Sequence, residues 1–305
     1  MSSVETVRRP RPKGGGAAGA QSLFWRVPWL RPLVLLTPPV GWFVVIYLAA
    51  LVTLLITAFW TIDPFTTQIV QSWNLDNFRI IITDSTYWSI IGRTVGIATL
   101  VTATDAVLAF PFAYFMARVA TRRVQTLLFA AVLLPLWASY LARVYAWILI
   151  LNHSGVLNWS LQSIGLPPAN IGYTNTAMWL VFSYIWLPFM IIPVYAALER
   201  VPESLMEASA DQGARRWQTL RDVVLPLAAP GVVAGSIFTF SLTLGDYITP
   251  ILVGGASSTF IGNVVYANVG IANNIPFAAA LSMVPLGIMA VYLFIAYRLG
   301  AFEAL

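Results

Sequence analysis

Few side chains in this sequence are suited to covalent chemistry. The 305 residues include no cysteine, one histidine (His153) and one lysine (Lys13). This composition excludes thiolate metal sites, cysteine nucleophiles and paired-histidine zinc sites. A phosphate-binding loop needs a lysine directly after its second glycine, and no segment provides one. The sequence therefore predicts a protein that is not an enzyme, holds no metal and binds no cofactor itself.

Four ionisable residues instead fall inside long apolar segments, where a charge is costly and usually marks a transport path or an internal pair. They are Arg93, Asp105, Arg143 and Asp246. Counting 1.5 Å per helical residue places Arg143 and Asp246 at similar depths in the outer third of the membrane. One interpretation of this placement is a structural Arg143–Asp246 ion pair, and the other is a lining of the path.

Aromatic residues are the basis of the path interpretation, whereas the charge of Arg143 argues against a cationic substrate unless Asp246 neutralises it. Tyr140, Arg143 and Trp147 are spaced to share one helix face, and Tyr247 follows Asp246. Aromatic faces beside a carboxylate suit an ammonium group through cation–π attraction and charge pairing. The predicted path residues are Asp246, Tyr247, Asp105, Tyr140, Arg143 and Trp147.

The composition sets the elements that must carry these residues. The chain is 59% hydrophobic and only 10% charged, whereas soluble proteins carry roughly 25% charged residues. Long unbroken apolar runs argue for helices of about 20 residues rather than a β-barrel. We expect an all-α polytopic membrane protein with six transmembrane helices. The spans are predicted near residues 33–60, 88–117, 124–151, 176–198, 229–251 and 279–299.

Basic residues predict the orientation of these spans. Fourteen of the 17 Lys and Arg residues fall on one side, which the positive-inside rule assigns to the cytoplasm. Both termini are then cytoplasmic. Residues 1–32 form a basic, Pro/Gly-rich tail that we expect to be disordered or to lie on the membrane surface, and residues 33–305 form the membrane domain.

One cytoplasmic loop, residues 199–227, is too long and too charged to be a simple connection. Pro202 is suited to the start of a helix, and Gly213 to its end. The spacing predicts a short helix on the cytoplasmic face between them. Residues 214–225 are expected to form a second helix before Pro226 turns the chain back into the membrane.

This loop resembles a known motif. EASADQGARRWQTLRDVVLP fits E-A-A-x3-G-x9-I-x-L-P of ATP-binding-cassette importer permeases, with Ser for the second Ala and Val for Ile. The matching positions are Glu207, Ala208, Ser209, Gly213, Val223, Leu225 and Pro226. The resemblance implies a type I importer permease fold in which this helix couples the permease to an ATPase subunit. A compact Ala/Ser face and flanking charges suit such a wet interface.

The resemblance extends over residues 88–300, in strings such as LPLWASYLARVYAWILIL and TLGDYITPILVGG. They are similar to the first permease of spermidine/putrescine-type (PotB-like) importers, and neighbouring subfamilies for iron, phosphonates and opines share them. The resemblance implies a second permease subunit, two ATPase subunits carrying ATP and Mg, and an external solute-binding protein. The chain would lie in a bacterial inner membrane and would bind no nucleic acid.

An ion-coupled secondary carrier or channel is the alternative. It needs a relay of carboxylates within the membrane, and only Asp105 is a reasonable member. It also leaves the 199–227 loop without a use.

Overall fold

The computed structural model describes residues 30–298, with side chains from residue 35 onward. Of the predicted tail, residues 1–29 lie outside this part of the chain. The chain forms two units, residues 1–56 and 57–305, and each is described by itself. The first unit holds α2 (Leu30–Phe43), a π-helical turn η1 (Val44–Leu48) and most of α3 (Ala49–Thr57). The stretch Leu35–Thr57 is long and apolar enough to span a membrane.

The second unit is also helical, apart from one small hairpin. The hairpin pairs β1 (Thr61–Ile62) with β2 (Ile69–Val70) in antiparallel register. The elements that follow are α4 (Asp76–Thr83), α5 (Ser85–Tyr114), η2 (Phe115–Val119), α6 (Arg122–Trp137), α7 (Tyr140–Leu151), α8 (Val156–Ser163), α9 (Asn175–Arg200), α10 (Glu203–Asp211), α11 (Arg216–Thr219), η3 (Leu220–Val224), α12 (Leu225–Gly245), α13 (Ile248–Val253), α14 (Ile261–Gly270) and α15 (Ile275–Arg298).

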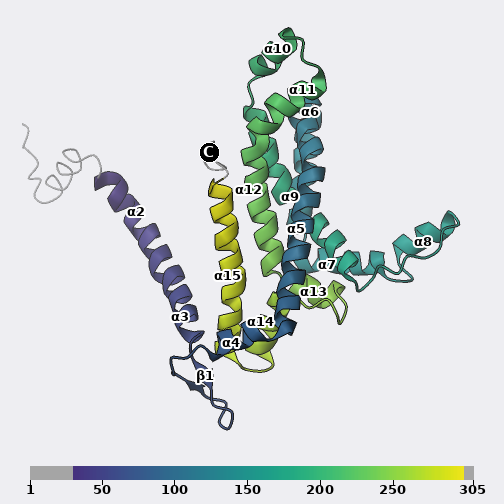
Figure 1. Ribbon diagram of the computed structural model, residues 1–305. Coiled ribbons are helices and arrows are strands. Elements are labelled where there is room, and N and C mark those ends of the chain that lie inside the picture. The colour runs from purple at the N-terminus through teal and green to yellow at the C-terminus, as the bar shows by residue number, and fades with distance from the viewer. Residues whose placement is uncertain (1–29, 299–305) are drawn as a thin grey trace, which may run out of the picture. The chain divides into compact units, whose positions relative to one another are not determined.

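Three long helices, α5, α9 and α12, pack together and form the core of this unit (Figure 1). One buried cluster includes Val101 of α5 and Phe182 of α9. A second joins Ala109 of α5 to Val194 of α9 and Ala228 of α12. The ends of the core are distinct, because α10 and α11 lie at one end and α4, α13 and α14 at the other (Figure 1).

Glycines allow α12 to approach α9 closely. A Cβ atom on Gly231 would lie 2.4 Å from the Cβ of Ala197, and one on Gly235 would lie 2.6 Å from the sulfur of Met190. Small residues at helix contacts are the usual means of close packing in membranes, where the hydrophobic effect does not drive helices together. The packing of α9 against α12 therefore depends on these two positions.

At the α4 end, Asp84 fixes the start of α5. Its carboxylate accepts a hydrogen bond of 2.8 Å from the backbone N–H of Thr86, as helix-capping residues do. This bond also lowers the pKa of Asp84 below its ordinary value. The preceding connection is anchored by Asn77, whose amide donates to the carbonyls of Ala58 and Trp60.

Among the described residues, five helical stretches are long and apolar enough to cross a membrane. They are Leu35–Thr57, Ser85–Val119, Asn175–Arg200, Arg216–Gly245 and Ile275–Arg298. A sixth crossing is obtained when α6 and the segment Tyr140–Ser163 are counted as one broken span. The predicted all-α polytopic membrane fold is confirmed.

The predicted continuous span 124–151 is wrong in one respect. The chain bends by 94° between Arg122–Trp137 and Tyr140–Ser163. Pro135 lies in the last turn of α6, and Ala138 and Ser139 are extended rather than helical. A proline removes one backbone donor and obstructs the turn before it, so α6 is already weakened in its last turns, next to the bend.

The region after the short loop helix also differs from expectation. Residues 216–245 form one continuous helical stretch, so Pro226 does not separate two helices. Pro226 lies inside this stretch, directly after the π-helical turn η3, where the backbone hydrogen bonds already depart from the regular α-helical pattern. The other end of the predicted span 229–251 is broken, because Asp246 is extended and α13 begins at Ile248.

Candidate functional site

The short helix predicted in the 199–227 loop is α10. Pro202 precedes it, and Gly213 follows its end with a φ of +82°, in the left-handed region that glycine adopts most easily. The N–H groups of Gly213 and Ala214 donate to the carbonyls of Ala210 and Ser209, at 2.8 and 3.1 Å. These bonds satisfy carbonyls that a helix end leaves without partners. Gly213 therefore ends α10 and turns the chain toward α11.

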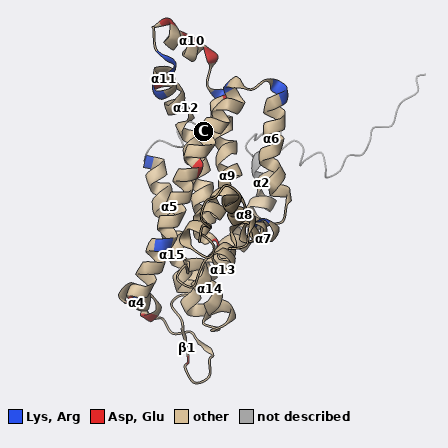
Figure 2. Ribbon diagram, turned by 90° about the vertical axis from the view of Figure 1, so that its right-hand side faces the viewer, with Lys and Arg blue, Asp and Glu red and all other residues tan. Residues whose placement is uncertain are grey.

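A side-chain contact closes this hairpin. The hydroxyls of Ser209 in α10 and Thr219 in α11 lie 3.0 Å apart. Glu207 and Ala208 remain exposed, and in the described part of the chain no hydrogen bond or ion pair involves the Glu207 carboxylate. The charged residues gather at this end of the helices (Figure 2). The exposed face of α10 is thus free to contact another protein.

The second half of the motif lies where the loop returns to the core. Val223 belongs to η3, and Leu225 and Pro226 begin α12. Their neighbour Val224 is buried in the same cluster as Leu198 of α9. The structure therefore places the motif in two parts, with Glu207–Gly213 on the protruding hairpin and Val223–Pro226 at its root.

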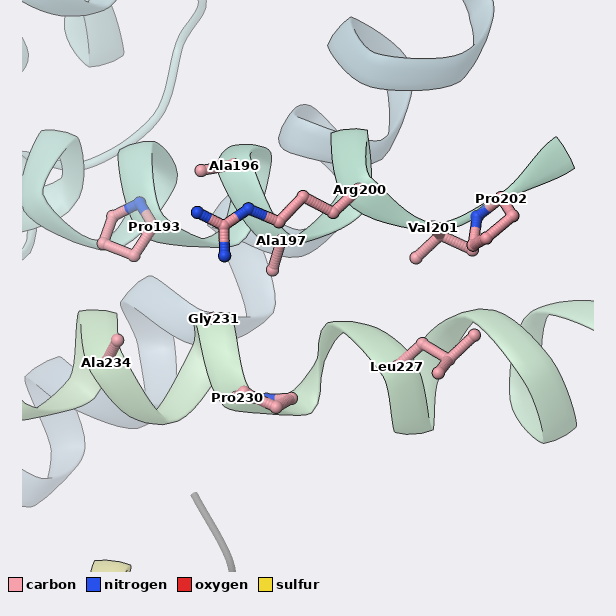
Figure 3. Close-up of a pocket in the computed structure, with 10 residues that line it drawn as sticks. All are labelled: Pro193, Ala196, Ala197, Arg200, Val201, Pro202, Leu227, Pro230, Gly231 and Ala234. Carbon is pink, nitrogen blue, oxygen red and sulfur yellow. The ribbon is translucent and has the colours of Figure 1, made fainter. Parts of the chain in front are cut away.

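A groove lies beside this root, between the last turns of α9 and the first turns of α12 (Figure 3). Its volume is about 310 Å³. It is lined by Pro193, Ala196, Ala197, Arg200, Val201, Pro202, Leu227, Pro230, Gly231 and Ala234. All of these except Arg200 are apolar, and most are small. Near the loop, α9 and α12 therefore do not fill the space between them.

At the other end, the structure brings Tyr140 and Asp246 together. The Tyr140 hydroxyl donates a hydrogen bond to the Asp246 carboxylate and lies 2.5 Å from the Thr249 hydroxyl. Asp246 also accepts backbone hydrogen bonds from Ile248 at 2.7 Å and Thr249 at 3.2 Å. The carboxylate therefore caps α13 and ties it to α7.

The predicted Arg143–Asp246 ion pair does not form, since the one ion pair among the described residues joins Arg221 to Asp222. Asp246 is already engaged by Tyr140 and by the start of α13. The Arg143 guanidinium instead lies 5.9 Å from the Tyr140 ring centroid, and its Nε and Nη1 atoms are buried without partners.

The aromatic residues of this region form two separate groups. Tyr140 stacks on Trp186 of α9 with centroids 5.9 Å apart, while Trp147 packs against Tyr184 at 5.4 Å. Tyr247 stacks on Tyr266 of α14 at 4.8 Å. Sequence spacing placed Tyr140 and Trp147 on one helix, but it held no signal for their partners on α9 and α14.

Asp105 is a buried residue of α5, which packs against α9. It is fully buried, and neither carboxylate oxygen has a hydrogen-bond partner among the described residues. The side chain of Ser183 in α9 lies close enough to influence the Asp105 carboxyl, and its hydroxyl is also buried without a hydrogen-bond partner among the described residues. Within the described part of the chain, no hydrogen bond or ion pair links Asp105 to Asp246 or to the other predicted path residues.

Two contacts at the α10 end of the helices have no counterpart in the sequence prediction. Arg118 of η2 donates hydrogen bonds to the carbonyls of Leu198 and Val201 at the end of α9. The amide of Gln125 in α6 donates to the Tyr195 hydroxyl at 2.5 Å. Both join residues that are 70 or more positions apart, so local spacing carries no signal for them.

Comparison with known proteins identifies the family. Residues 109–300 match the family of binding-protein-dependent transport system inner membrane components, and the chain belongs to this family. It is 47% identical over 318 aligned residues to the inner membrane ABC transporter permease protein YdcU of Escherichia coli (strain K12), with 100% of this chain and 99% of that one covered.

Two further matches place this chain in the same class. It is 31% identical over 267 residues to the spermidine/putrescine transport system permease protein PotB of Salmonella typhimurium (strain LT2), covering 87% of this chain and 92% of PotB. A bacterial alginate ABC transporter solved with an alginate-bound periplasmic protein shares the fold, with a TM-score of 0.74 and 19% identity over 93% of this chain and 97% of that one. The chain is a multi-pass permease subunit of a binding-protein-dependent ABC importer.

Proposed function

We propose that this chain is the passive gate of an importer whose ATP hydrolysis takes place on separate subunits, and that α10 is the coupling helix. The observation that carries the proposal is the α10 hairpin. Its exposed face presents Glu207 and Ala208, Ser209 ties the helix to Thr219 of α11, Gly213 fixes its turn, and its root joins both α9 and α12. The other proposed coupling residues are Val223, Leu225 and Pro226.

The proposed assembly contains a second permease subunit, two ATPase subunits that bind ATP and Mg, and an external solute-binding protein. The solved alginate transporter includes a bound periplasmic protein, which supports the last of these partners. Both termini are proposed to face the cytoplasm, on the side of α10. ATP shifts the gate only because it binds one state of the assembly more tightly than the other.

Polyamines are the proposed substrate class. The similarity to a spermidine/putrescine permease supports this choice, and so do the aromatic groups at the α13 end. There, the proposed path residues are Tyr140, Trp147 and Tyr247. Asp246 holds α13 and α7 in place beside them. Arg143 and Asp105 are proposed to contribute their charges to the path. A protonated polyamine can bind aromatic faces through cation–π attraction.

The test is ATPase stimulation in the assembled importer. The chain is co-expressed with its ATPase, partner permease and binding protein, and ATP hydrolysis is measured with the binding protein loaded with spermidine or putrescine. We expect co-purification of the ATPase and stimulation by at least one polyamine. Stimulation only by iron, a phosphonate or an opine would overturn the substrate class. Uptake that needs no ATPase and follows a proton gradient would overturn the importer itself.

A further inference from the structure

Arg118 connects two cytoplasmic loops that are far apart in the sequence. It belongs to the π-helical turn η2, which ends α5 and leads to α6. Its half-buried guanidinium donates through Nη2 to the carbonyl oxygens of Leu198 and Val201. Val201 lies directly before Pro202, which opens α10. One side chain therefore contacts the end of α9 and the start of the loop hairpin together.

Physical chemistry favours an arginine at this point. The last four carbonyls of a helix have no partners within it, and the helix dipole leaves partial negative charge there. Leu198 provides one of these carbonyls, which also accepts the Val201 N–H at 3.3 Å, and Val201 is the residue after the helix; the guanidinium bonds to both carbonyls and brings the complementary charge. Hydrogen bonds of this kind, with a charged donor, are about twice as strong as neutral ones. The contact is therefore strong enough to hold two backbone segments together.

A second contact ties the same two segments. Gln125 of α6 donates to the Tyr195 hydroxyl, which in turn donates to Glu199 at 3.2 Å. The rings of Phe129 and Tyr195 pack with centroids 5.9 Å apart. The end of α9 is thus fixed to the α5–α6 connection on one side.

On its other side, α9 packs closely against α12, and an open groove lies beside this contact. There, the groove between α9 and α12 leaves space of about 310 Å³ beside Val201 and Pro202 (Figure 3). Arg200, which lies over this groove, makes no hydrogen bond or ion pair with any residue that the structure describes. The end of α9 is therefore tied to α5 and α6, and the start of the loop at Val201 and Pro202 borders open space beside α12.

We infer that Arg118 is a positioning residue for coupling: it makes α10, the end of α9 and the α5–α6 connection move as one body when the ATPase moves α10. This inference rests on the proposed function, because it assumes that α10 receives the ATPase's motion. Displacement is carried from the hairpin through Val201 and Leu198 to Arg118, and from there into α5 and α6. The groove beside Val201 and Pro202 leaves the α10 side of this body room to shift relative to the start of α12.

The experiment measures distances between spin labels in the reconstituted importer. The chain has no cysteine, so introduced cysteines label it at chosen positions only. One pair, Thr126→Cys in α6 and Glu203→Cys in α10, reports on the proposed rigid body. The other, Glu203→Cys with Ala229→Cys in α12, reports on motion across the groove. All three positions are exposed.

In the unaltered background, we expect the 126–203 distance to be the same without nucleotide and in the vanadate-trapped state, while the 203–229 distance changes. In Arg118→Ala, the 126–203 distribution should broaden and become state-dependent. Transport per ATP should fall by about tenfold, as expected when charge-assisted hydrogen bonds are lost. Arg118→Lys keeps a charged donor, so it should partly restore both the narrow 126–203 distribution and the transport per ATP. The matched control is Arg122→Ala, an exposed position in the same connection, which should change neither.

A 126–203 distribution in Arg118→Ala identical to that of the unaltered chain would overturn the inference. If Arg118→Ala does not assemble, Arg118→Gln replaces it, and an unchanged distribution there overturns the inference equally. Failure of the proposed function looks different. In that case even the unaltered chain would show no ATP-dependent change in the 203–229 distance.

Discussion

The Tyr140 hydroxyl donates a hydrogen bond to the Asp246 carboxylate, across 106 positions of sequence. This contact joins the two breaks in the helical spans, because Tyr140 begins α7 after the bend and Asp246 separates α12 from α13. The same carboxylate caps α13 through the N–H groups of Ile248 and Thr249. Asp246 therefore acts first as a structural anchor for the α13 end.

The first prediction concerns this anchor. Asp246→Ala removes the cap and leaves the Tyr140 hydroxyl without its acceptor, so the unfolding free energy should fall by about 1–3 kcal/mol. Tyr140→Phe keeps the ring on Trp186 and should cost about 1 kcal/mol. Thermal unfolding of the purified permease in detergent measures both. Unchanged stability of Asp246→Ala, with weakened substrate-dependent stimulation, would favour a direct contact with substrate instead.

The second prediction concerns the end of α10. Gly213 has a φ of +82° but nothing within 4 Å of an added Cβ, so Gly213→Ala costs conformational strain alone. That strain should be about 1–2 kcal/mol and should loosen the turn into α11. We expect a lower coupling of ATP hydrolysis to transport, with the spans intact by circular dichroism.

Gly287→Ala is the matched control for Gly213. A Cβ added at Gly287 would also meet open space, but Gly287 lies inside α15 and has no positive φ. The substitution should be neutral or should stabilise the helix by up to about 1 kcal/mol. Equal effects at both positions would contradict the role given to the Gly213 turn.

The third prediction concerns close packing of α12 on α9. Gly231→Ala places a Cβ atom 2.4 Å from the Ala197 Cβ and 2.6 Å from the Pro193 carbonyl oxygen, so the helices must separate. Overpacking of this kind costs about 1–3 kcal/mol. The melting temperature should drop, whereas Gly92→Ala in α5, with nothing within 4 Å, should not lower it. A Gly231→Ala variant as stable as the unaltered chain would show that α12 can move away freely.

The fourth prediction separates docking from folding. Glu207 is exposed and makes no contact that an arginine would break within the described part of the chain, so Glu207→Arg should change stability by less than about 0.5 kcal/mol. Charge reversal on a docking face should nevertheless abolish co-purification of the ATPase. A variant that unfolds, or one that retains the ATPase fully, would contradict the proposal.

The sequence predicted those features that depend on nearby residues. Pro202 marks the start of α10 and Gly213 marks its end, because a proline suits a helix start and a glycine suits a left-handed turn. The apolar runs predicted the spans, because the length and hydropathy of a span are also properties of consecutive residues. The bend between α6 and α7 was missed, because Pro135 within a span is compatible with either a continuous or a broken helix.

Contacts between distant segments could not be predicted. The Arg118 contact with Val201 joins residues 83 positions apart, and the partners of Asp246 likewise come from another helix. Judged by depth in the membrane alone, Arg143 was as good a partner for Asp246 as Tyr140. Only the three-dimensional arrangement of α7 against α13 decides that Tyr140 fills that place.

Crosslinking from α10 tests the central claim most directly. Ala208→Cys provides a single exposed thiol on the hairpin, and Thr66→Cys provides a matched thiol in the β1–β2 connection. With a short bifunctional reagent and the assembled importer, we predict a covalent product of the 208 variant with the ATPase subunit and none from the 66 variant. An assembly that contains the ATPase but yields no product at 208 would contradict the role of α10 as the coupling helix.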